Sequence, residues 1–379
     1  MANAESLRKV ATILQKASAQ SKIAVVVSAS AGVTDALLQC GLKASDGDAS
    51  YKTDVQALLQ QHILIVQNLL PVVTQSSLLS YIMQQFNEVA DICNSVAILQ
   101  DFSPKSKDKL LSYGEILSSQ ILSRFLCSEN IVNAWKDARE LIVTDAQFNN
   151  ANVQFEKTNE NVQAYFASNQ STITILPGFI AANTDGQTTT LGRGGSDYTA
   201  AILGAALHAE VVEIWTDVSG MMTADPRLVQ NAKCLKTLSY HEAMELSHFG
   251  AKVIYPPTLA PLMQKNIPVW IKNTFSPEAR GTLIASKSSD NANLIKGISN
   301  MLGLALLSLE GSGMVGIPGF SKRLFESLAG AKINVILITQ ASSEHSICVG
   351  VEEPLAEKAK AIIDAFAEVT VGQPRSWAT

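Results

Sequence analysis

A glycine-rich turn in the middle of the chain restricts most strongly what this sequence can fold into. Three of the four residues at 192–195 are glycines, which let the backbone approach a ligand because they carry no Cβ. Ser196 is a suitable N-cap, and Asp197–Ala209 has the composition of a helix. The first N–H groups of such a helix attract phosphate or carboxylate, and Arg193 adds a planar cation for the same kind of anion. The turn therefore predicts an anion site at the start of a helix.

Short apolar runs on either side of this turn predict the strands of an α/β sheet. Val211–Val218 is rich in β-branched residues and carries Thr216 and Asp217 near its end, where an α/β sheet offers its ligand-binding edge. Ile23–Ser30 is a near-continuous apolar run, as expected of a parallel strand that is buried on both faces. Thr172–Ala182 is a third run of this kind, and helical patterns separate the three.

The composition excludes several classes of protein. With 379 residues, 47% of them hydrophobic and 17% charged, the chain is long enough for two or three domains with real cores. A net charge of −5 gives no general basic surface for nucleic acid, and no apolar stretch is long enough to cross a membrane. The five cysteines show no CxxC spacing and the first residues carry no secretory signal, so we expect reduced thiols in a cytoplasmic protein.

Several motifs, taken together, indicate a family. GRGGSD at 192–197, followed by a helical segment and then by WTDV, six residues and DPR, resembles the aspartokinase signature within the amino acid kinase family. SASAGVT at 28–34, the Gly-Glu pair at 114–115 and FGAKV at 249–253 occur in the matching order, so the resemblance covers roughly the whole chain. It is most similar to the kinase portion of the fused aspartokinase–homoserine dehydrogenases.

The resemblance implies an open three-layer α/β/α sandwich with a mostly parallel sheet. It also implies an enzyme that moves the γ-phosphoryl group of ATP to the side-chain carboxylate of L-aspartate. Because that carboxylate is the nucleophile, the protein has to supply alignment and charge compensation. In the family roles, Arg193 clamps the aspartate carboxylate, Glu115 holds its ammonium group and Asp197 organises the reacting centre. Hydroxyl contacts are implied for Ser28, Ser30, Thr34 and Ser196.

The same resemblance implies a nucleotide-binding half. It assigns the contacts with ATP to Thr216, Asp217, Met222, Arg227 and Lys252, with Mg²⁺ bridging the phosphates and no site in which protein ligands alone hold a metal. Met222 stands where relatives often carry a tyrosine. Without the motifs, a lone lysine at 252 or glutamate at 115 would be interpreted as a solvated surface residue.

From Ile298 onwards the pattern changes to strand, helix, strand, strand, helix, which is most of a ferredoxin-like βαββαβ unit. Its residues resemble an ACT domain, a sensor of small amino acids, and the resemblance places Asn334 and Gln340 in an effector site, with threonine as the expected effector. Because ACT units generally pair their sheet edges, we expect a homo-oligomer. The expected domains are a kinase domain over 1–285, a linker over 286–297 and a single, incomplete ACT-like domain over 298–379.

The sequence departs from the family pattern at both ends. Relatives open with a strand that ends in K-F-G-G-T-S, whose lysine approaches the transferred phosphoryl group, and no such string occurs in this sequence. No second ACT unit and no dehydrogenase follow. We therefore expect a chain trimmed at both ends, with impaired turnover, since loss of a comparable cation lowers rates by about 10³–10⁵. Two alternatives stay open: a non-catalytic amino-acid sensor on a kinase scaffold, and a kinase for glutamate or acetylglutamate.

Overall fold

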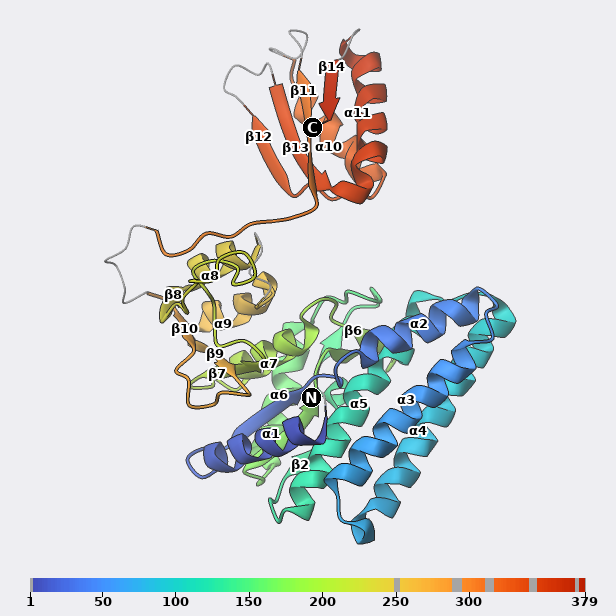
Figure 1. Cartoon of the computed structure of the whole chain (residues 1–379), viewed down its shortest axis with the longest axis vertical. Coiled ribbons are helices and arrows are strands. Elements are labelled where there is room, and N and C mark those ends of the chain that lie inside the picture. The colour runs from blue at the N-terminus through green and yellow to red at the C-terminus, as the bar shows by residue number, and fades with distance from the viewer. Residues whose placement is uncertain are drawn as a thin grey trace. The chain divides into compact units, whose positions relative to one another are not determined.

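The computed structural model describes residues 3–248, 253–287, 295–310, 317–340, 346–371 and 375–378. The chain forms two compact units, Met1–Ser299 and Asn300–Thr379, and each is described here by itself (Figure 1). The first unit mixes helices with mainly parallel strands, and the second is a small antiparallel sheet with two long helices.

Helices at the start of the chain form one layer of the first unit, in which α2 to α5 lie side by side (Figure 1). Their bounds are α1 (Ala4–Ser18), α2 (Val33–Ser45), α3 (Tyr51–Leu69), α4 (Val72–Leu99) and α5 (Pro104–Ser128). Apolar residues at helical spacing meet in a shared core, where Leu37, Ile82 and Leu122 are at most 1% exposed. α5 begins at Pro104 because the Ser103 side chain accepts the N–H of its first turn.

A three-stranded parallel sheet packs against this helical layer. Its strands are β4 (Ile173–Pro177) at the centre, with β1 (Ile23–Val27) and β2 (Ala134–Trp135) on either side. Successive side chains of a strand point to opposite faces, so Ile175 of β4 joins the core of α1 to α5 while Leu176 joins a second core. In that second core Leu176 meets Val162 of α6 (Phe155–Ser168) and Ile202 of α7 (Gly195–Ala206), which form the other helical layer.

β1 differs from its expected environment. Among the described residues it pairs with β4 alone, so it lies at the edge of its sheet. Only Val27 of its five residues is buried, and the expectation that Ile23–Ser30 would be buried on both faces was wrong. An apolar run reports the preference of its side chains for burial, and it does not report which strands lie beside it.

The apolar run Thr172–Ala182 is divided between two sheets. β4 ends at Pro177, and β5 (Ile180–Asn183) begins after Gly178 and Phe179. Phe179 adopts φ of +67°, a backbone conformation that is uncommon for an aromatic residue and turns the chain into the second sheet. There β5 lies between β3 (Val143–Thr144) and β6 (Thr188–Thr190), and β6 leads directly into the glycine-rich turn.

The rest of the first unit is built on a four-stranded sheet of order β7-β9-β10-β8. Its strands are β7 (Val212–Thr216), β8 (Thr237–Ser239), β9 (Val269–Asn273) and β10 (Thr282–Ala285), and it packs on α8 (Tyr240–His248) and α9 (Ala260–Lys265). Only the β9–β10 pair is antiparallel. α7 packs against β1 of the first sheet and against β7 of this one, so a single helix joins the two sheets.

The last residues of the first unit return to the loop that follows β7. The N–H of Ile298 donates to the carbonyl of Thr223 at 2.8 Å, and Lys296 pairs with Glu242 of α8 at 2.7 Å. A Cβ on Gly297 would lie 3.2 Å from the same Thr223 carbonyl, so glycine permits this close approach. The segment is therefore fastened to the body of the first unit immediately before the second unit begins.

The second unit is a βαββαβ fold. Its elements are β11 (Leu304–Glu310), α10 (Phe320–Gly330), β12 (Leu337–Gln340), β13 (Ser346–Glu352), α11 (Ala356–Val371) and β14 (Arg375–Ala378). The antiparallel strand order is β12-β13-β11-β14, and Leu307, Val349 and Leu324 meet in the core under the helices. β14 is the sixth element of the motif, and the sequence pattern did not reveal it.

The predicted fold class, a mixed α/β sandwich with mostly parallel strands followed by a ferredoxin-like βαββαβ unit, is confirmed. The strands of the first unit are divided among three sheets rather than one. No helix in the described ranges has both the length and the apolar character needed to span a bilayer.

Candidate active site

The turn between β1 and α2 is held against α5 by two contacts. Gly32 adopts φ of +77° where α2 begins, so the turn uses a conformation that favours glycine. A Cβ on Gly114 of α5 would lie 2.9 Å from the Ala29 Cβ. One helical turn later, the Ser118 hydroxyl donates to the carbonyl of Ser28 at 2.7 Å. Ser30 is buried in this turn.

Glu115 lies between these two contacts, and its carboxyl group is buried with little compensation. The side chain is 4% exposed, and the N–H of Ala29 donates to its carboxylate. The Oε2 atom is buried and finds no hydrogen-bond partner among the described residues. Burial raises the pKa of Glu115 to about 8. A carboxyl group in this state gains strongly from any cation that reaches it.

Ser196 and Asp197 lie in the first turn of α7, which meets the ends of β1 and β4. A Cβ on Gly178 would lie 2.8 Å from the Ser196 Cα, and the N–H of Gly178 donates to the carbonyl of Val27 at 2.9 Å. The end of β1, the end of β4 and the first turn of α7 therefore meet at one place. Burial raises the pKa of Asp197 to about 6.

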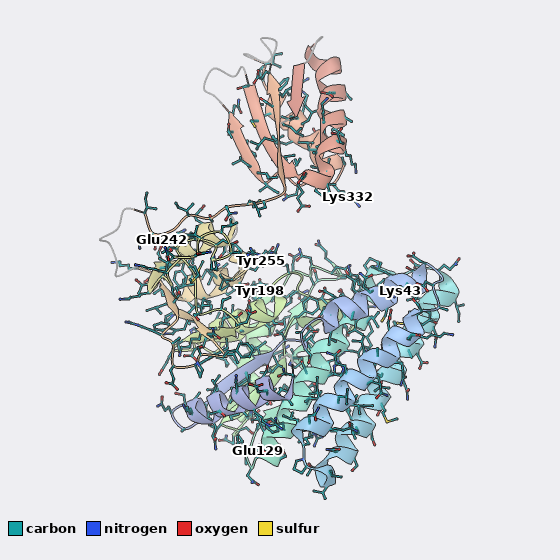
Figure 2. The ribbon with its side chains drawn as sticks, viewed as in Figure 1. Lys43, Glu129, Tyr198, Glu242, Tyr255 and Lys332 are labelled. Atoms are coloured by element: carbon teal, nitrogen blue, oxygen red, sulfur yellow. The ribbon has the colours of Figure 1, made fainter. Side chains whose placement is uncertain are left out.

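Arg193 is exposed on the glycine-rich turn, and within the described part of the chain its guanidinium forms no ion pair. Gly194, at φ of +66°, caps α7, and a Cβ there would lie 2.6 Å from the Tyr255 Cβ. Tyr255 and Tyr198 of α7 are labelled in Figure 2. Lys252 lies outside the described residues, but the contact of Tyr255 with Gly194 brings the chain back to the turn three residues later.

The residues assigned to the nucleotide follow β7. Thr216 ends the strand, and its hydroxyl donates to Asp217 at 3.1 Å. Arg227 is exposed and donates through two nitrogens to the carboxylate of Asp225. Met222 is half-buried. The structure thus forms two groups of predicted residues, one at the ends of β1 and β4 and one after β7. α7 packs against β1 and against β7, so it lies beside both groups.

Two residues that the sequence did not single out, Asp108 and Phe179, contribute to this part of the site. Asp108 of α5 is fully buried and accepts hydrogen bonds from the backbone N–H groups of Asn149 and Thr190. Phe179 holds the strained turn, and its ring fills the space that a Cβ on Gly195 would need. Asp108 stands in a charged stretch, PKSKDKLL, in which nothing distinguishes a buried carboxylate from a solvated one.

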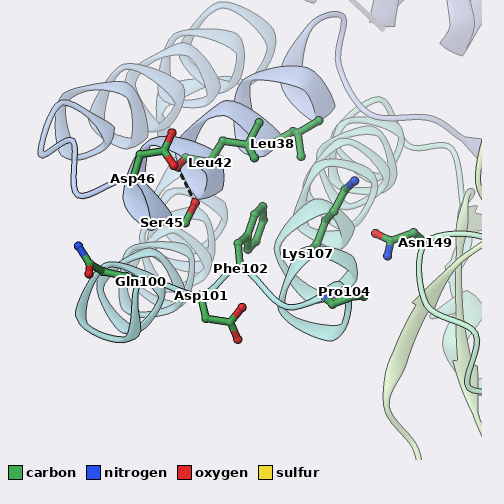
Figure 3. A pocket seen from close by; sticks show the side chains of 10 residues that line it. All are labelled: Leu38, Leu42, Ser45, Asp46, Gln100, Asp101, Phe102, Pro104, Lys107 and Asn149. Carbon is green, nitrogen blue, oxygen red and sulfur yellow. Dashed lines mark hydrogen bonds between the residues drawn. The ribbon is translucent and has the colours of Figure 1, made fainter. Parts of the chain in front are cut away.

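A hollow of about 480 Å³ lies beside the Asn149 loop, away from the predicted residues. Leu42, Phe102, Lys107 and Asn149 are among the residues that line it (Figure 3). The Oδ1 atom of Asn149 is buried without a hydrogen-bond partner. Of the residues predicted to hold aspartate or ATP, none that lies within the described ranges lines this hollow.

In the second unit, Asn334 precedes β12 and Gln340 ends it. Both side chains are exposed, so both are accessible to a ligand. Across the described ranges of both units, no three histidine, cysteine, aspartate or glutamate side chains come together in a way that could hold a metal ion.

Comparisons with protein families assign each unit. Residues 1–273 match the model of the amino acid kinase family, and residues 307–366 match an ACT domain model. The bifunctional aspartokinase/homoserine dehydrogenase 2 of Arabidopsis thaliana, a chloroplastic protein, is 38% identical over 357 residues, which are 93% of this chain and 39% of that protein. The chain thus spans well under half of that relative.

A single-function relative and its structure are also similar. The lysine-sensitive aspartokinase 3 of Escherichia coli is 35% identical over 86% of this chain and 70% of its own length. The crystal structure of E. coli aspartokinase III in complex with aspartate and ADP matches with a TM-score of 0.83 and 29% identity, covering 100% of this chain and 83% of that one. The resemblance read from the motifs is confirmed.

Proposed function

Because this chain belongs to the amino acid kinase family, we propose that it transfers the γ-phosphoryl group of ATP to the β-carboxylate of L-aspartate. The product would be an acyl phosphate and ADP. Support comes from the relatives named aspartokinase and from the way in which the fold groups the residues assigned to aspartate.

The state of Glu115 carries the proposal. A buried carboxyl group with a free Oε2 atom and a pKa raised to about 8 is unfavourable in the absence of a partner. The ammonium group of an amino acid supplies both the charge and the hydrogen-bond donors that this atom lacks. The same arrangement rejects ligands whose amino group is acetylated, because these leave the carboxylate unpaired.

The remaining contacts divide between the two ends of the substrate. Arg193 offers an unpaired guanidinium fork, which suits a carboxylate. The first N–H groups of α7, after Gly194, carry the positive end of the helix dipole and stabilise negative charge on the transferred group. Ser28, Ser30, Thr34 and Ser196 supply hydroxyl groups, and Asp197 orients the reacting centre. Phosphoryl transfer of this kind depends on alignment and charge compensation rather than on a protein nucleophile.

The nucleotide belongs to the second group in this proposal. Thr216, Asp217, Met222, Arg227 and Lys252 are the residues assigned to it. Mg²⁺ binds proteins through one or two carboxylates together with substrate phosphates, so it needs no cage of protein ligands. When bound, Mg²⁺ neutralises charge on the phosphates.

The test is a coupled assay for ADP release together with capture of the acyl phosphate by hydroxylamine. Turnover with L-aspartate is expected, with much less for N-acetyl-L-aspartate and for L-glutamate. Calorimetry with aspartate and with ATP measures binding independently of turnover. Absence of both turnover and aspartate binding would refute the proposal, and preference for glutamate would assign the chain to another amino acid kinase.

The proposal extends to the second unit, which is expected to bind threonine through Asn334 and Gln340. Titration with threonine and with lysine separates the two effectors, since the E. coli relative is named lysine-sensitive. Gln340→Ala is expected to abolish the binding. Threonine binding by a chain that binds no ATP would support the sensor alternative. Light scattering tests the homo-oligomer expected from paired ACT units.

A further inference from the structure

Asp108 is a fully buried carboxylate near the site, and the proposed chemistry does not use it. Its side chain is 0% exposed. The Oδ2 atom accepts the N–H of Asn149 at 2.9 Å and that of Thr190 at 3.0 Å, and the Oδ1 atom accepts the Thr190 hydroxyl at 2.8 Å. One side chain of α5 thus holds two separate segments of backbone.

Both segments lead to the glycine-rich turn. Thr190 ends β6, two residues before Gly192. A Cβ on Gly192 would lie 2.5 Å from the Asn150 Oδ1 atom and 3.3 Å from the Asn149 carbonyl, so the Asn149 loop supports the turn from one side. The N–H of Ala151 donates to the carbonyl of Thr190 at 3.0 Å and ties the loop to the strand. Asp108 therefore holds both the strand that enters the turn and the loop that supports it.

The helix that carries Asp108 also carries Glu115. The two residues are seven positions apart, close to two turns, so they lie on the same face of α5, about 10 Å apart along its axis. Glu115 is the group assigned to the ammonium end of aspartate, and Arg193 on the turn is assigned to its carboxylate. A single rigid helix then sets the separation between the two ends of the substrate site.

If the side chain at position 108 served only to pack the core, an apolar residue would fill the position at a lower cost in free energy. A buried carboxylate loses its hydration, and three hydrogen bonds offset that loss without exceeding what a well-packed apolar residue provides. What the carboxylate adds is direction, because its two oxygens fix the approach of particular N–H groups.

We propose that Asp108 is a positioning residue that holds the glycine-rich turn at the distance from Glu115 at which L-aspartate fits. The inference rests on the proposed function. It adds to that function a residue that controls the affinity for aspartate without touching it, and that leaves the nucleotide half unaffected.

The experiment compares Asp108→Ala and Asp108→Asn with Asp145→Ala. Asp145 is the control, because its carboxylate also accepts the N–H groups of two loop residues, Gln147 and Asn152, but within the described ranges forms no hydrogen bond with α5 or Thr190. Asp108→Ala is expected to weaken aspartate binding by about tenfold or more while ATP binding changes by less than about twofold. Asp108→Asn should recover most of the affinity, since its amide oxygen accepts both N–H groups and its NH₂ donates to the Thr190 hydroxyl.

Amide hydrogen exchange provides a readout that does not need activity. Faster exchange across residues 190–195 is expected in Asp108→Ala, and in Asp145→Ala the increase should stay within the loop at 145–152. Unchanged exchange at 190–195, or equal losses of aspartate and ATP affinity in Asp108→Ala, would overturn the positioning role. Failure of the wild type to bind aspartate would count against the proposed function alone, and the exchange result would still decide the role of Asp108.

Discussion

Gly114 of α5 packs directly on Ala29 of the turn that follows β1, with 2.9 Å between the Ala29 Cβ and the position that a Cβ would take at residue 114. Real Cβ atoms do not approach so closely, so alanine at 114 must push α5 away from the turn. The adjacent Glu115 accepts the N–H of Ala29 and would lose that hydrogen bond.

Gly114→Ala is therefore expected to lower the free energy of unfolding of the first unit by about 1–3 kcal/mol, even though alanine favours helix. It should also weaken aspartate binding. Urea denaturation and calorimetry measure the two effects. Gly330→Ala in α10, where a Cβ would meet nothing within 4 Å, is the control and should not destabilise its own unit. A Gly114→Ala protein as stable as the wild type would contradict this account of the contact.

Glu115→Gln is expected to impair function and to raise the free energy of unfolding, by an amount that depends on pH. The pKa of Glu115 is raised from 4.5 to about 8, so between these values the folded protein keeps a proton that the unfolded chain has released. The free energy of unfolding of the wild type then falls as pH rises through this window. Glutamine does not ionise, so the variant does not show this fall. From pH 6 to pH 8.5 the stability of the variant relative to the wild type should increase by on the order of 2 kcal/mol. Urea titrations at the two pH values measure it, and an equal difference at both would argue against a buried, proton-holding Glu115.

Aspartate binding is expected to release a proton. At pH 7 Glu115 is mostly protonated, and pairing with an ammonium group requires the carboxylate. Affinity should therefore rise from pH 6 to pH 8. Calorimetry in phosphate and in Tris, which differ in ionisation enthalpy, counts the protons, and close to one is expected at pH 7. Identical heats in the two buffers would exclude the coupling.

Gly178→Ala is expected to disrupt the part of the site where β1 and β4 end. The added Cβ would meet the Ser196 Cα at 2.8 Å, and a backbone atom cannot move aside as a flexible side chain can. The first turn of α7 must shift, and Ser196 and Asp197 shift with it. A loss of about 10²-fold in kcat/KM is expected in the coupled assay, with nucleotide affinity little changed. Turnover at the wild-type level would show that this contact does not matter for the chemistry.

Much of the fold could be predicted from local sequence. The bounds of the helix Ala4–Ser18 and of the strand Ser346–Glu352 can be read from the sequence, because their apolar spacing and their flanking residues agree. The division of Thr172–Ala182 could not be predicted, because the apolar run is continuous and the break depends on the left-handed conformation of Phe179. The start of the helix Phe155–Ser168 could not be predicted either, since its first turns are polar and lack the apolar stripe.

The candidate site shows the same limit. Arg193, Ser196 and Asp197 could be identified because they stand together in one motif. Asp108 could not, because its importance arises from contacts with Asn149 and Thr190, 41 and 82 residues away in the sequence. Motifs report residues that meet a ligand, and the residues that hold the motif in place carry no local signal.

The fastening of Ile298 to the Thr223 carbonyl has a mechanical consequence. Thr223 sits between Met222 and Asp225, the partner of Arg227, on the loop assigned to the nucleotide. Asn300, where the second unit begins, is only two residues beyond Ile298. Any tension on the chain at that boundary would act first on this hydrogen bond, and through it on the loop that we assign to the nucleotide.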